Sequence, residues 1–312
     1  MTRAVMRAAR FHKFGPPEVL VVEEVPRPEP REGQVLVRVH SAGVNPIDWK
    51  LRAGHLQQHM PVELPCTPGY DVAGTVEALG PGASRFRPGQ AVFGRGSAAY
   101  AEYAAVPVTA LALKPANISF DQAAAIPIGG VTAWAGLFDA GELQAGQRLL
   151  VQGAAGGVGS FAVQLGKWKG AHVIGTASSS NLDYVRSLGA DGVVDYTAGP
   201  VERAVSAVDV IFDTVGGETM NRSWSLLRPG GILIEIVGMP DEDAAKQHGV
   251  RTSGVQAPPD ISGILSQIAG LIESGAVKPE AGVVLPLDEA ARAHSVSETR
   301  HGRGRIVLHV AD

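Results

Sequence analysis

Apolar residues in the middle of the chain occur in short runs, and helical segments separate several of these runs. Helices are expected from the end of a glycine-rich turn to about Lys169, and from Asn181 to Leu188. The runs that we expect to form strands are residues 149–152, 171–176, 192–195, 208–212 and 231–237. Short apolar runs that alternate with helices are typical of a parallel, doubly wound sheet. The middle of the chain is therefore predicted to be an α/β domain with a Rossmann-type sheet.

The first 120 residues follow a different pattern, in which apolar and polar positions alternate and prolines and glycines divide the stretches. A period of two is typical of strands with one buried face. The alternating stretches are residues 19–25, 34–40, 71–79 and 98–106. One or two helical turns are expected over Pro46–Arg52, ended by Gly54. This region is predicted to be an antiparallel or barrel-like β domain.

The regions that flank the α/β domain contain further helical patterns. Ser119 is a candidate N-cap, with Gln122 at the capping-box position. Residues 238–259 show no regular pattern, and the chain closes with a strand over residues 304–310. We expect this last strand to rejoin the first domain, which would make that domain discontinuous. The remaining predicted helices are residues 132–140, 261–274 and 288–299.

A glycine-rich turn, Gly153 to Gly159, follows the first apolar run of the α/β domain. Its glycines have the spacing GxxGxxG, and Ala154 stands where the commoner GxGxxG motif has a glycine. Glycine allows positive φ and close approach of a ligand, and the helix N-terminus that follows attracts phosphate. The turn alone fits a dinucleotide site or an ordinary strand-to-helix connection. The predicted sheet around it favours the dinucleotide site.

The segment after the second strand of this domain bears on which dinucleotide binds. An NAD site usually has Asp or Glu there, bonded to the ribose 2′-hydroxyl. Here the segment is Thr176-Ala177-Ser178-Ser179-Ser180-Asn181, with no acid before Asp183 and no Lys or Arg. Hydroxyl groups can donate to a 2′-phosphate, so the segment favours NADPH over NADH, and its alternative interpretation is a solvated loop.

Composition narrows the classes of protein. The chain has 312 residues, 45% hydrophobic and 19% charged, with a formal net charge of −4, which suits about two globular domains. No basic run is present, so nucleic acid is not an expected partner. Cys66 is the one cysteine, and neither a signal sequence nor a membrane-length apolar run is apparent. A cytoplasmic protein without a membrane partner is expected.

Several motifs occur together and in a fixed order along the chain. They are Ser41–Gly54, Pro68–Gly74, Gly153–Gly159, Asp213–Gly217, Leu227–Gly231 and Arg303–Arg305. Together they resemble the medium-chain dehydrogenases/reductases, and among these the zinc-free quinone oxidoreductase (zeta-crystallin-like) branch. The resemblance implies a GroES-like catalytic domain over residues 1–120, completed by about 275–312, and a Rossmann domain over 121–274. It also implies NADPH, a cleft between the domains, and a homodimer that pairs the edges of the Rossmann sheets.

The same resemblance bears on metal content. A catalytic zinc needs about three protein ligands. Zinc-dependent relatives have Cys where this chain has Asn45 and His where it has Tyr70, and Asp71 replaces a neighbouring Glu. His55 and His59 are four residues apart in a proline-bounded loop and are interpreted as structural or solvated. No metal site is expected, which argues against an alcohol dehydrogenase.

The candidate catalytic residues are Asn45, Lys50 and Tyr70. The resemblance places Asn45 and Lys50 near nicotinamide and substrate, where Asn45 could donate to an enolate or a ribose and Lys50 could stabilise an oxyanion. Tyr70 is a candidate proton donor or polar wall. Their alternative roles are a turn residue, a solvated lysine and a packing aromatic, and Asp48 is expected to bond a local backbone N–H. Quinone reductases often have Tyr at the position of Lys50, which favours enone and enal substrates.

The resemblance also implies which residues contact NADPH. The backbone of residues 156–158 would hold the pyrophosphate, and Ser178 and Ser179 would face the 2′-phosphate. Relatives often have Lys where Asn181 stands, and Arg303 is the candidate to replace it, its alternative role being a surface charge. The complete set of expected contacts is Asn45, Thr132, Gly156, Gly157, Val158, Ser178, Ser179, Tyr196, Val215, Gly238 and Arg303.

The leading functional hypothesis is a zinc-independent, NADPH-dependent reductase of enones and enals, with quinones as alternative acceptors. A non-catalytic NADPH-binding protein with a sensing or structural role is the second hypothesis. A zinc alcohol dehydrogenase and an enoyl reductase for long thioesters are the third and fourth. Polar Asn45 and Lys50 favour a catalyst over the second hypothesis.

Overall fold

A computed structural model of the chain describes residues 4–300 and 302–311. These residues form two compact units, each of which is described separately below. The first unit contains the described residues up to Ile128, together with Pro259–Ser274 and those from Pro279 onward. The second unit contains Gly129–Pro258 and Gly275–Lys278. None of the helices in the described ranges is long and apolar enough to cross a membrane.

The first unit is built on a seven-stranded sheet, whose order is β14-β15-β3-β4-β5-β7, with β6 also paired to β3. Most neighbouring strands are antiparallel, as the alternating pattern predicted. Val35, Val37 and Val39 on β3 are all fully buried, as a period of two requires. The strands are β3 (Gln34–Val44), β4 (Asp71–Leu79), β5 (Ala91–Arg95), β6 (Tyr103–Pro107), β7 (Leu111–Leu113), β14 (Ala281–Pro286) and β15 (Arg305–His309).

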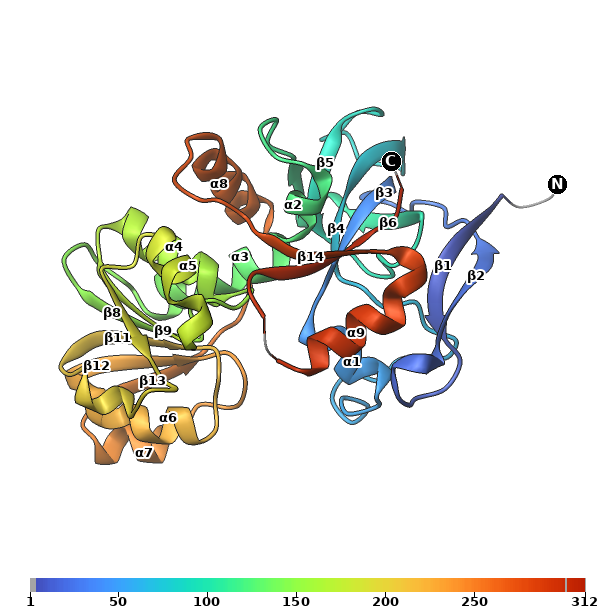
Figure 1. Ribbon diagram of the computed structural model, residues 1–312. Helices are drawn as coiled ribbons and strands as arrows, with labels where there is room; N and C mark the ends of the chain where they lie inside the picture. Colours follow the sequence, from blue (N-terminus) through green and yellow to red (C-terminus); the bar gives the residue numbers. More distant parts are fainter. Residues whose placement is uncertain (1–3, 301, 312) are drawn as a thin grey trace. The chain divides into compact units, whose positions relative to one another are not determined.

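The C-terminal segment completes this sheet. Strand β15 pairs antiparallel with β3, with Ile306 opposite Val44, and parallel with β14. In Figure 1 the red strand β14 lies in the same unit as the blue strand β3, and β15 stands between the two in the strand order. The prediction that the last strand rejoins the first domain is therefore confirmed.

A hairpin and the helices α1, α2, α8 and α9 complete the first unit. The hairpin pairs β1 (Val5–Phe11) with β2 (Leu20–Pro26). The predicted capping box holds the start of α2, because Ser119 Oγ accepts from the Gln122 N–H at 3.1 Å and Gln122 Oε1 accepts from the Ser119 N–H at 3.0 Å. The helices are α1 (Pro46–Arg52), α2 (Phe120–Ala124), α8 (Ser262–Glu273) and α9 (Ala290–Glu298).

The second unit is a six-stranded parallel sheet with the order β10-β9-β8-β11-β12-β13. This is the doubly wound arrangement that the alternating runs predicted. Its strands are β8 (Arg148–Gln152), β9 (His172–Ala177), β10 (Gly192–Asp195), β11 (Val208–Asp213), β12 (Leu227–Glu235) and β13 (Arg251–Gly254). Its helices are α3 (Pro127–Trp134, whose first two residues belong to the first unit, continued by a π-helical turn at Ala135–Ala140), α4 (Gly159–Lys169), α5 (Leu182–Ser187), α6 (Glu218–Ser223) and α7 (Glu242–Gln247).

Two expectations about individual elements are corrected by the structure. Residues 238–259 are not irregular throughout, because α7 and β13 lie within them. Strand β13 has the sequence Arg-Thr-Ser-Gly at the edge of the sheet, so no apolar pattern marked it. The strand expected over residues 98–106 begins only at Tyr103, since Ala98 has φ +57° and lies in a turn.

The boundary of the α/β domain at residue 274 stays a prediction. Helix α8, which precedes that boundary, belongs to the first unit. It packs against β7, and the Ile261 N–H at its start donates to the Thr109 carbonyl at 3.1 Å.

Candidate functional site

The glycine-rich turn of the second unit is fixed by close backbone contacts. Gly153 has φ +71°, and a Cβ there would lie 2.4 Å from Thr214 Oγ1. A Cβ on Gly159 would lie 2.2 Å from the Gly153 carbonyl oxygen, so the first turn of α4 can pack over the end of β8 only with glycine at this position. Strand β8 lies between β9 and β11, which is the switch point of the sheet. These residues fit a dinucleotide, since the turn and the N-terminus of α4 provide a phosphate cradle.

Polar side chains line the carboxyl edge of the sheet beside this turn. Gln152, Asp213 and Glu235 end β8, β11 and β12 and stand opposite one another in the strand register. Asp213 accepts the Val215 N–H at 2.8 Å, and Glu235 accepts the Gly238 N–H. Burial raises the pKa of Asp213, and burial together with Asp213 raises the pKa of Glu235. The two carboxyl groups thus hold the loops that carry the predicted contacts Val215 and Gly238.

The predicted 2′-phosphate residues follow β9. Ser178 is half-buried and Ser179 is exposed, and the side chain of Tyr196, after β10, is also exposed. The Ser179 hydroxyl donates to Asp195 Oδ2 at 2.5 Å, so a carboxylate from the neighbouring strand lies among these residues. Sequence inspection missed Asp195 because it considered only the segment after the second strand. Thr132 lies half-buried on α3 of the same unit.

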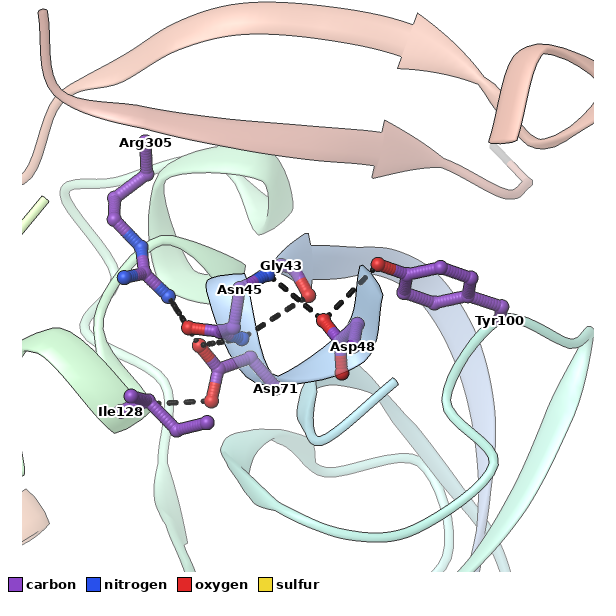
Figure 2. A network of polar contacts seen from close by, with 7 residues as sticks. All are labelled: Gly43, Asn45, Asp48, Asp71, Tyr100, Ile128 and Arg305. Atoms are coloured by element: carbon purple, nitrogen blue, oxygen red, sulfur yellow. Dashed lines mark hydrogen bonds and ion pairs between the residues drawn. The ribbon is translucent and has the colours of Figure 1, made fainter. Parts of the chain in front are cut away.

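In the first unit, Asn45 is buried in a polar network that links three distant segments (Figure 2). Its amide Nδ2 donates to Asp71 Oδ2 at 3.1 Å and, more weakly, to the Gly43 carbonyl at 3.4 Å. Arg305 donates to Asn45 Oδ1 and, at 2.8 Å, to Asp71 Oδ2. The other Asp71 oxygen accepts the Ile128 N–H at 2.9 Å. Both functions of the Asn45 amide are thus engaged by protein groups, and Asn45 is also the N-cap residue of α1.

Asp48 continues the network from α1 toward α9. Its Oδ2 accepts the Asn45 N–H at 2.8 Å and the Tyr100 hydroxyl at 3.1 Å (Figure 2). The first of these bonds confirms that Asp48 binds a local backbone N–H. His294 Nε2 lies 3.3 Å from the Tyr100 hydroxyl. All three side chains are fully buried, and burial raises the pKa of Asp48 to about 7 and lowers the pKa of His294 to about 3.

Two cations lie near the ring of Trp49: Lys50 in the last turn of α1, and Arg300 just after α9. The Lys50 ammonium lies 5.9 Å from the Trp49 ring centre, and the Arg300 guanidinium lies 6.0 Å from it. Burial, followed by repulsion from Arg300, lowers the pKa of Lys50. Among the described residues, no carboxylate lies within ion-pair distance of the Lys50 ammonium. Lys50 is therefore a half-buried cation that a substrate anion could pair with.

Two other predicted residues of the first unit are Tyr70 and Arg303. Tyr70 is half-buried just before β4, and burial, then Asp48 and Cys66, raise the pKa of its hydroxyl. Arg303 is exposed and pairs with Glu280 at 3.0 Å. Sequence inspection favoured Arg303 and missed Arg300 and Arg305. A signal for Arg305 was available, because residues 305 and 307 share one face of a strand and Val307 is apolar.

The donor set of this region does not fit zinc. Asn45 and Tyr70 offer an amide and a phenol rather than the thiolate and imidazole that catalytic zinc sites use, and Arg305 donates to the Asp71 carboxylate. In residues 4–300 and 302–311, no group of three or more His, Cys, Asp or Glu side chains could hold a metal ion. No chemical step is therefore assigned to a metal.

Comparisons with known proteins agree with the folds of the two units. Residues 31–116 match the family model described as "Alcohol dehydrogenase GroES-like domain", and residues 188–308 match the one described as "Zinc-binding dehydrogenase". The chain is 36% identical to an NADPH-dependent alkenal/one oxidoreductase, chloroplastic, of Arabidopsis thaliana, covering 97% of this chain and 79% of the relative. It is 35% identical to the quinone oxidoreductase of Mus musculus, covering 96% of each. The solved quinone oxidoreductase from Coxiella burnetii has a TM-score of 0.91 at 33% identity, covering 98% of this chain and all of that one.

Proposed function

The chain belongs to the quinone oxidoreductase branch of the medium-chain dehydrogenase/reductase superfamily, and from that premise we propose that it reduces activated alkenes with NADPH and without zinc. The substrates are enones and enals, whose conjugated carbonyl group accepts the electrons. The observation that carries this proposal is the half-buried Lys50 ammonium, which has no carboxylate partner among the described residues. The names of the Arabidopsis and mouse relatives support enones and quinones as the two acceptor classes.

Each candidate residue has a part in this chemistry. Bound NADPH supplies a hydride to an electron-poor carbon. The Lys50 ammonium stabilises the negative charge that develops on the substrate oxygen. Tyr70 donates the proton, and its raised pKa keeps the hydroxyl protonated at neutral pH. Asn45, engaged on both sides by Asp71 and Arg305, fixes the start of the helix that carries Lys50.

The second unit holds the nucleotide. The backbone of Gly156, Gly157 and Val158, just before α4, lies against the pyrophosphate. Gly157 and Val158 supply the N–H donors, because the Gly156 N–H donates to the Gly153 carbonyl at 3.0 Å. Thr132, Val215 and Gly238 contribute to the nicotinamide side, and Ser178, Ser179 and Tyr196 contribute to the adenine ribose. Arg303 stays a proposed contact, although its pairing with Glu280 favours its alternative role as a surface charge.

The oligomeric state and the cellular location are also part of the proposal. A homodimer is supported by β13, which ends the parallel sheet and leaves an edge for pairing. A cytoplasmic location is supported by the free thiol of Cys66, which suits a reducing compartment.

The test is steady-state oxidation of NADPH and NADH by the purified protein with 3-buten-2-one, trans-2-hexenal and 1,4-benzoquinone. We expect turnover on the alkenes that survives treatment with EDTA and falls in Lys50→Met. Turnover on the quinone alone would favour quinone reduction proper, the second candidate, which the mouse relative's name supports. Tight nucleotide binding without turnover on any acceptor would overturn both enone reduction and quinone reduction. The protein would then be a non-catalytic nucleotide-binding protein.

A further inference from the structure

The ends of β9 and β10 lie side by side, where the adenine ribose of a bound dinucleotide is expected. Asp195 is the last residue of β10 and stands opposite Ala177, the last residue of β9. The Tyr196 N–H then donates to the Ala177 carbonyl at 3.2 Å. The carboxylate that NAD-binding sheets place after their second strand is thus present here, but it comes from the neighbouring strand.

The Asp195 carboxylate is held in place by three donors. Ser179 Oγ donates to Oδ2 at 2.5 Å, and Thr197 donates to Oδ1 through its hydroxyl at 2.6 Å and its N–H at 2.8 Å. These bonds stabilise the ionised form and lower the pKa of Asp195, the Ser179 bond most. The site therefore contains a fixed negative charge at neutral pH.

The bond from Ser179 to Asp195 uses one of the two hydroxyl donors on which preference for a 2′-phosphate would depend. A serine hydroxyl has one proton, and Ser179 gives it to Asp195. Ser178 Oγ accepts from Asn181 Nδ2 at 3.2 Å, and it lies 3.3 Å from Ser180 Oγ. Of the two serines predicted to receive the phosphate, Ser179 has thus given its proton to Asp195, whereas Ser178 only accepts from Asn181.

In the part of the chain that the structure describes, no ion pair offsets the Asp195 carboxylate. Residues 176–183 and 195–199 contain neither Lys nor Arg. Among the residues that the structure describes, no cation lies within ion-pair distance of Asp195, and the nearby Arg186 pairs with Asp183 at 2.7 Å. A phosphate dianion placed beside an ionised carboxylate without a counter-charge is repelled.

We propose that Asp195 is a specificity-determining residue that accepts the ribose 2′-hydroxyl of NADH and opposes the 2′-phosphate of NADPH. The chain consequently uses both nucleotides, with a narrow margin between them. The inference rests on the proposed function only for the class of cofactor. It assigns to Asp195 the role that an acid after the second strand has in NAD-specific sheets.

The test measures binding of two adenosine fragments, 2′,5′-ADP and 5′-AMP, to the full chain by isothermal titration calorimetry. In the unaltered protein we expect the two dissociation constants to lie within about tenfold of each other. Asp195→Asn removes the charge and keeps an acceptor, and we expect it to tighten 2′,5′-ADP by about tenfold while 5′-AMP changes little. Asp183→Asn is the matched control, because its carboxylate is 99% exposed on α5 and is not bonded to Ser179, and we expect it to leave the ratio unchanged.

Two outcomes would overturn the inference. The first is an unaltered protein that binds 2′,5′-ADP more than about a hundredfold tighter than 5′-AMP, and the second is a ratio that Asp195→Asn does not move. If Asp195→Asn does not fold, Asn181→Lys adds a cation to the same segment and should tighten 2′,5′-ADP selectively; failure to do so would also count against the assignment. The binding ratio does not depend on turnover, so failure of the reductase assay would refute the proposed function and leave this inference standing.

Discussion

Arg305 and Asp71 form a buried ion pair, 2.8 Å between nitrogen and oxygen, although 234 residues separate them in the chain. The Arg305 side chain is 5% exposed and the Asp71 side chain 0%. The same Asp71 carboxylate accepts from Asn45 and from the Ile128 N–H. One carboxylate therefore fixes β15, the start of α1 and the end of the first unit's N-terminal segment together.

Removal of the Arg305 charge should destabilise the protein strongly. Arg305→Met leaves Asp71 buried without its counter-charge, and the loss of one partner of such a pair costs about 3–5 kcal/mol in unfolding free energy. Burial already raises the pKa of Asp71, and Arg305 opposes that shift, so the variant should raise the pKa further. Urea denaturation at pH 7 measures the loss.

The matched control is Arg292→Met, which breaks the exposed pair between Arg292 and Glu289 at 2.6 Å. An exposed pair contributes about 0–1 kcal/mol, so this variant should be near the unaltered protein. Equal losses of unfolding free energy in the two variants would show that burial of the Arg305–Asp71 pair does not increase its contribution to stability. Adding Asp71→Asn to Arg305→Met should recover part of the loss, because the unpaired charge is then removed.

Asp48 should make the protein less stable as the pH rises. Its pKa is raised by burial from 3.8 to about 7, so the folded chain binds this proton more tightly than the unfolded chain. The contribution of Asp48 is full below pH 3.8 and is lost as the pH rises through about 7, by up to ~1.4 kcal/mol per pH unit. Asp48→Asn cannot ionise, so between about pH 4 and 7 its unfolding free energy should rise with pH relative to that of the unaltered protein, while the curve of Asp183→Asn should stay parallel to the unaltered one. Parallel stability curves for Asp48→Asn and the unaltered protein, from urea denaturation between pH 4 and 8, would contradict the assignment.

His294 should have the opposite effect. Burial lowers its pKa from 6.5 to about 3, so its contribution is present above pH 6.5 and is lost as the pH falls toward about 3. Between about pH 4 and 6.5 the slopes of Asp48 and His294 partly cancel in the unaltered protein. His294→Gln should therefore leave a protein whose unfolding free energy falls with rising pH over that window. His172→Gln, at an imidazole that is 54% exposed, is the control and should keep the slope of the unaltered protein.

Local sequence predicted the elements of the fold well where a pattern extends over several residues. Strand β4 has the predicted bounds, Asp71–Leu79, and α1 has its predicted bounds, Pro46–Arg52. These elements have a clear period or a fixed start, with Pro46 at the first helical position. Strand β13, four polar residues at a sheet edge, had neither and was missed.

Pairings between distant segments could not be predicted in the same way. The bond between Ser179 and Asp195 depends on the register of β9 against β10, and the Arg305 pair depends on β15 returning to β3. Only the folded sheets bring these residues together, so a search confined to the neighbourhood of a motif could not find them. The sequence indicated Asn45 as polar and important, but its partners in the network became evident only from the structure.

Gly159 should not tolerate a side chain. A Cβ there would lie 2.2 Å from the Gly153 carbonyl oxygen, a backbone atom that cannot move without opening the turn. Gly159→Ala is expected to cost about 2–3 kcal/mol in unfolding free energy and to weaken binding of 5′-AMP and NADPH together. The control is Gly270→Ala inside α8, where a Cβ meets nothing within 4 Å and should be neutral or stabilising by up to about 1 kcal/mol. If Gly159→Ala folds and its nucleotide affinity is unchanged, the glycine-rich turn is not part of the cofactor site.

The repulsion between the Lys50 and Arg300 cations beside Trp49 should affect the pH dependence of turnover. Burial and the charge of Arg300 lower the pKa of Lys50 from 10.5, so an enzyme that needs the Lys50 cation should lose activity as the pH rises through that lowered value. Lys50→Met should reduce kcat about a hundredfold, the order found when one oxyanion donor is removed, and should flatten the alkaline limb. Lys50→Arg keeps the charge and should recover part of the rate.

Arg300→Met distinguishes an electrostatic role of Lys50 from a structural one. Removal of the neighbouring charge raises the pKa of Lys50, so the alkaline limb of the kcat profile should move to higher pH in this variant. A structural role would lower kcat at every pH without moving the limb. If the limb stays in place in Arg300→Met and persists in Lys50→Met, it reports another group, and Tyr70, whose pKa is raised by burial, is then the first residue to substitute.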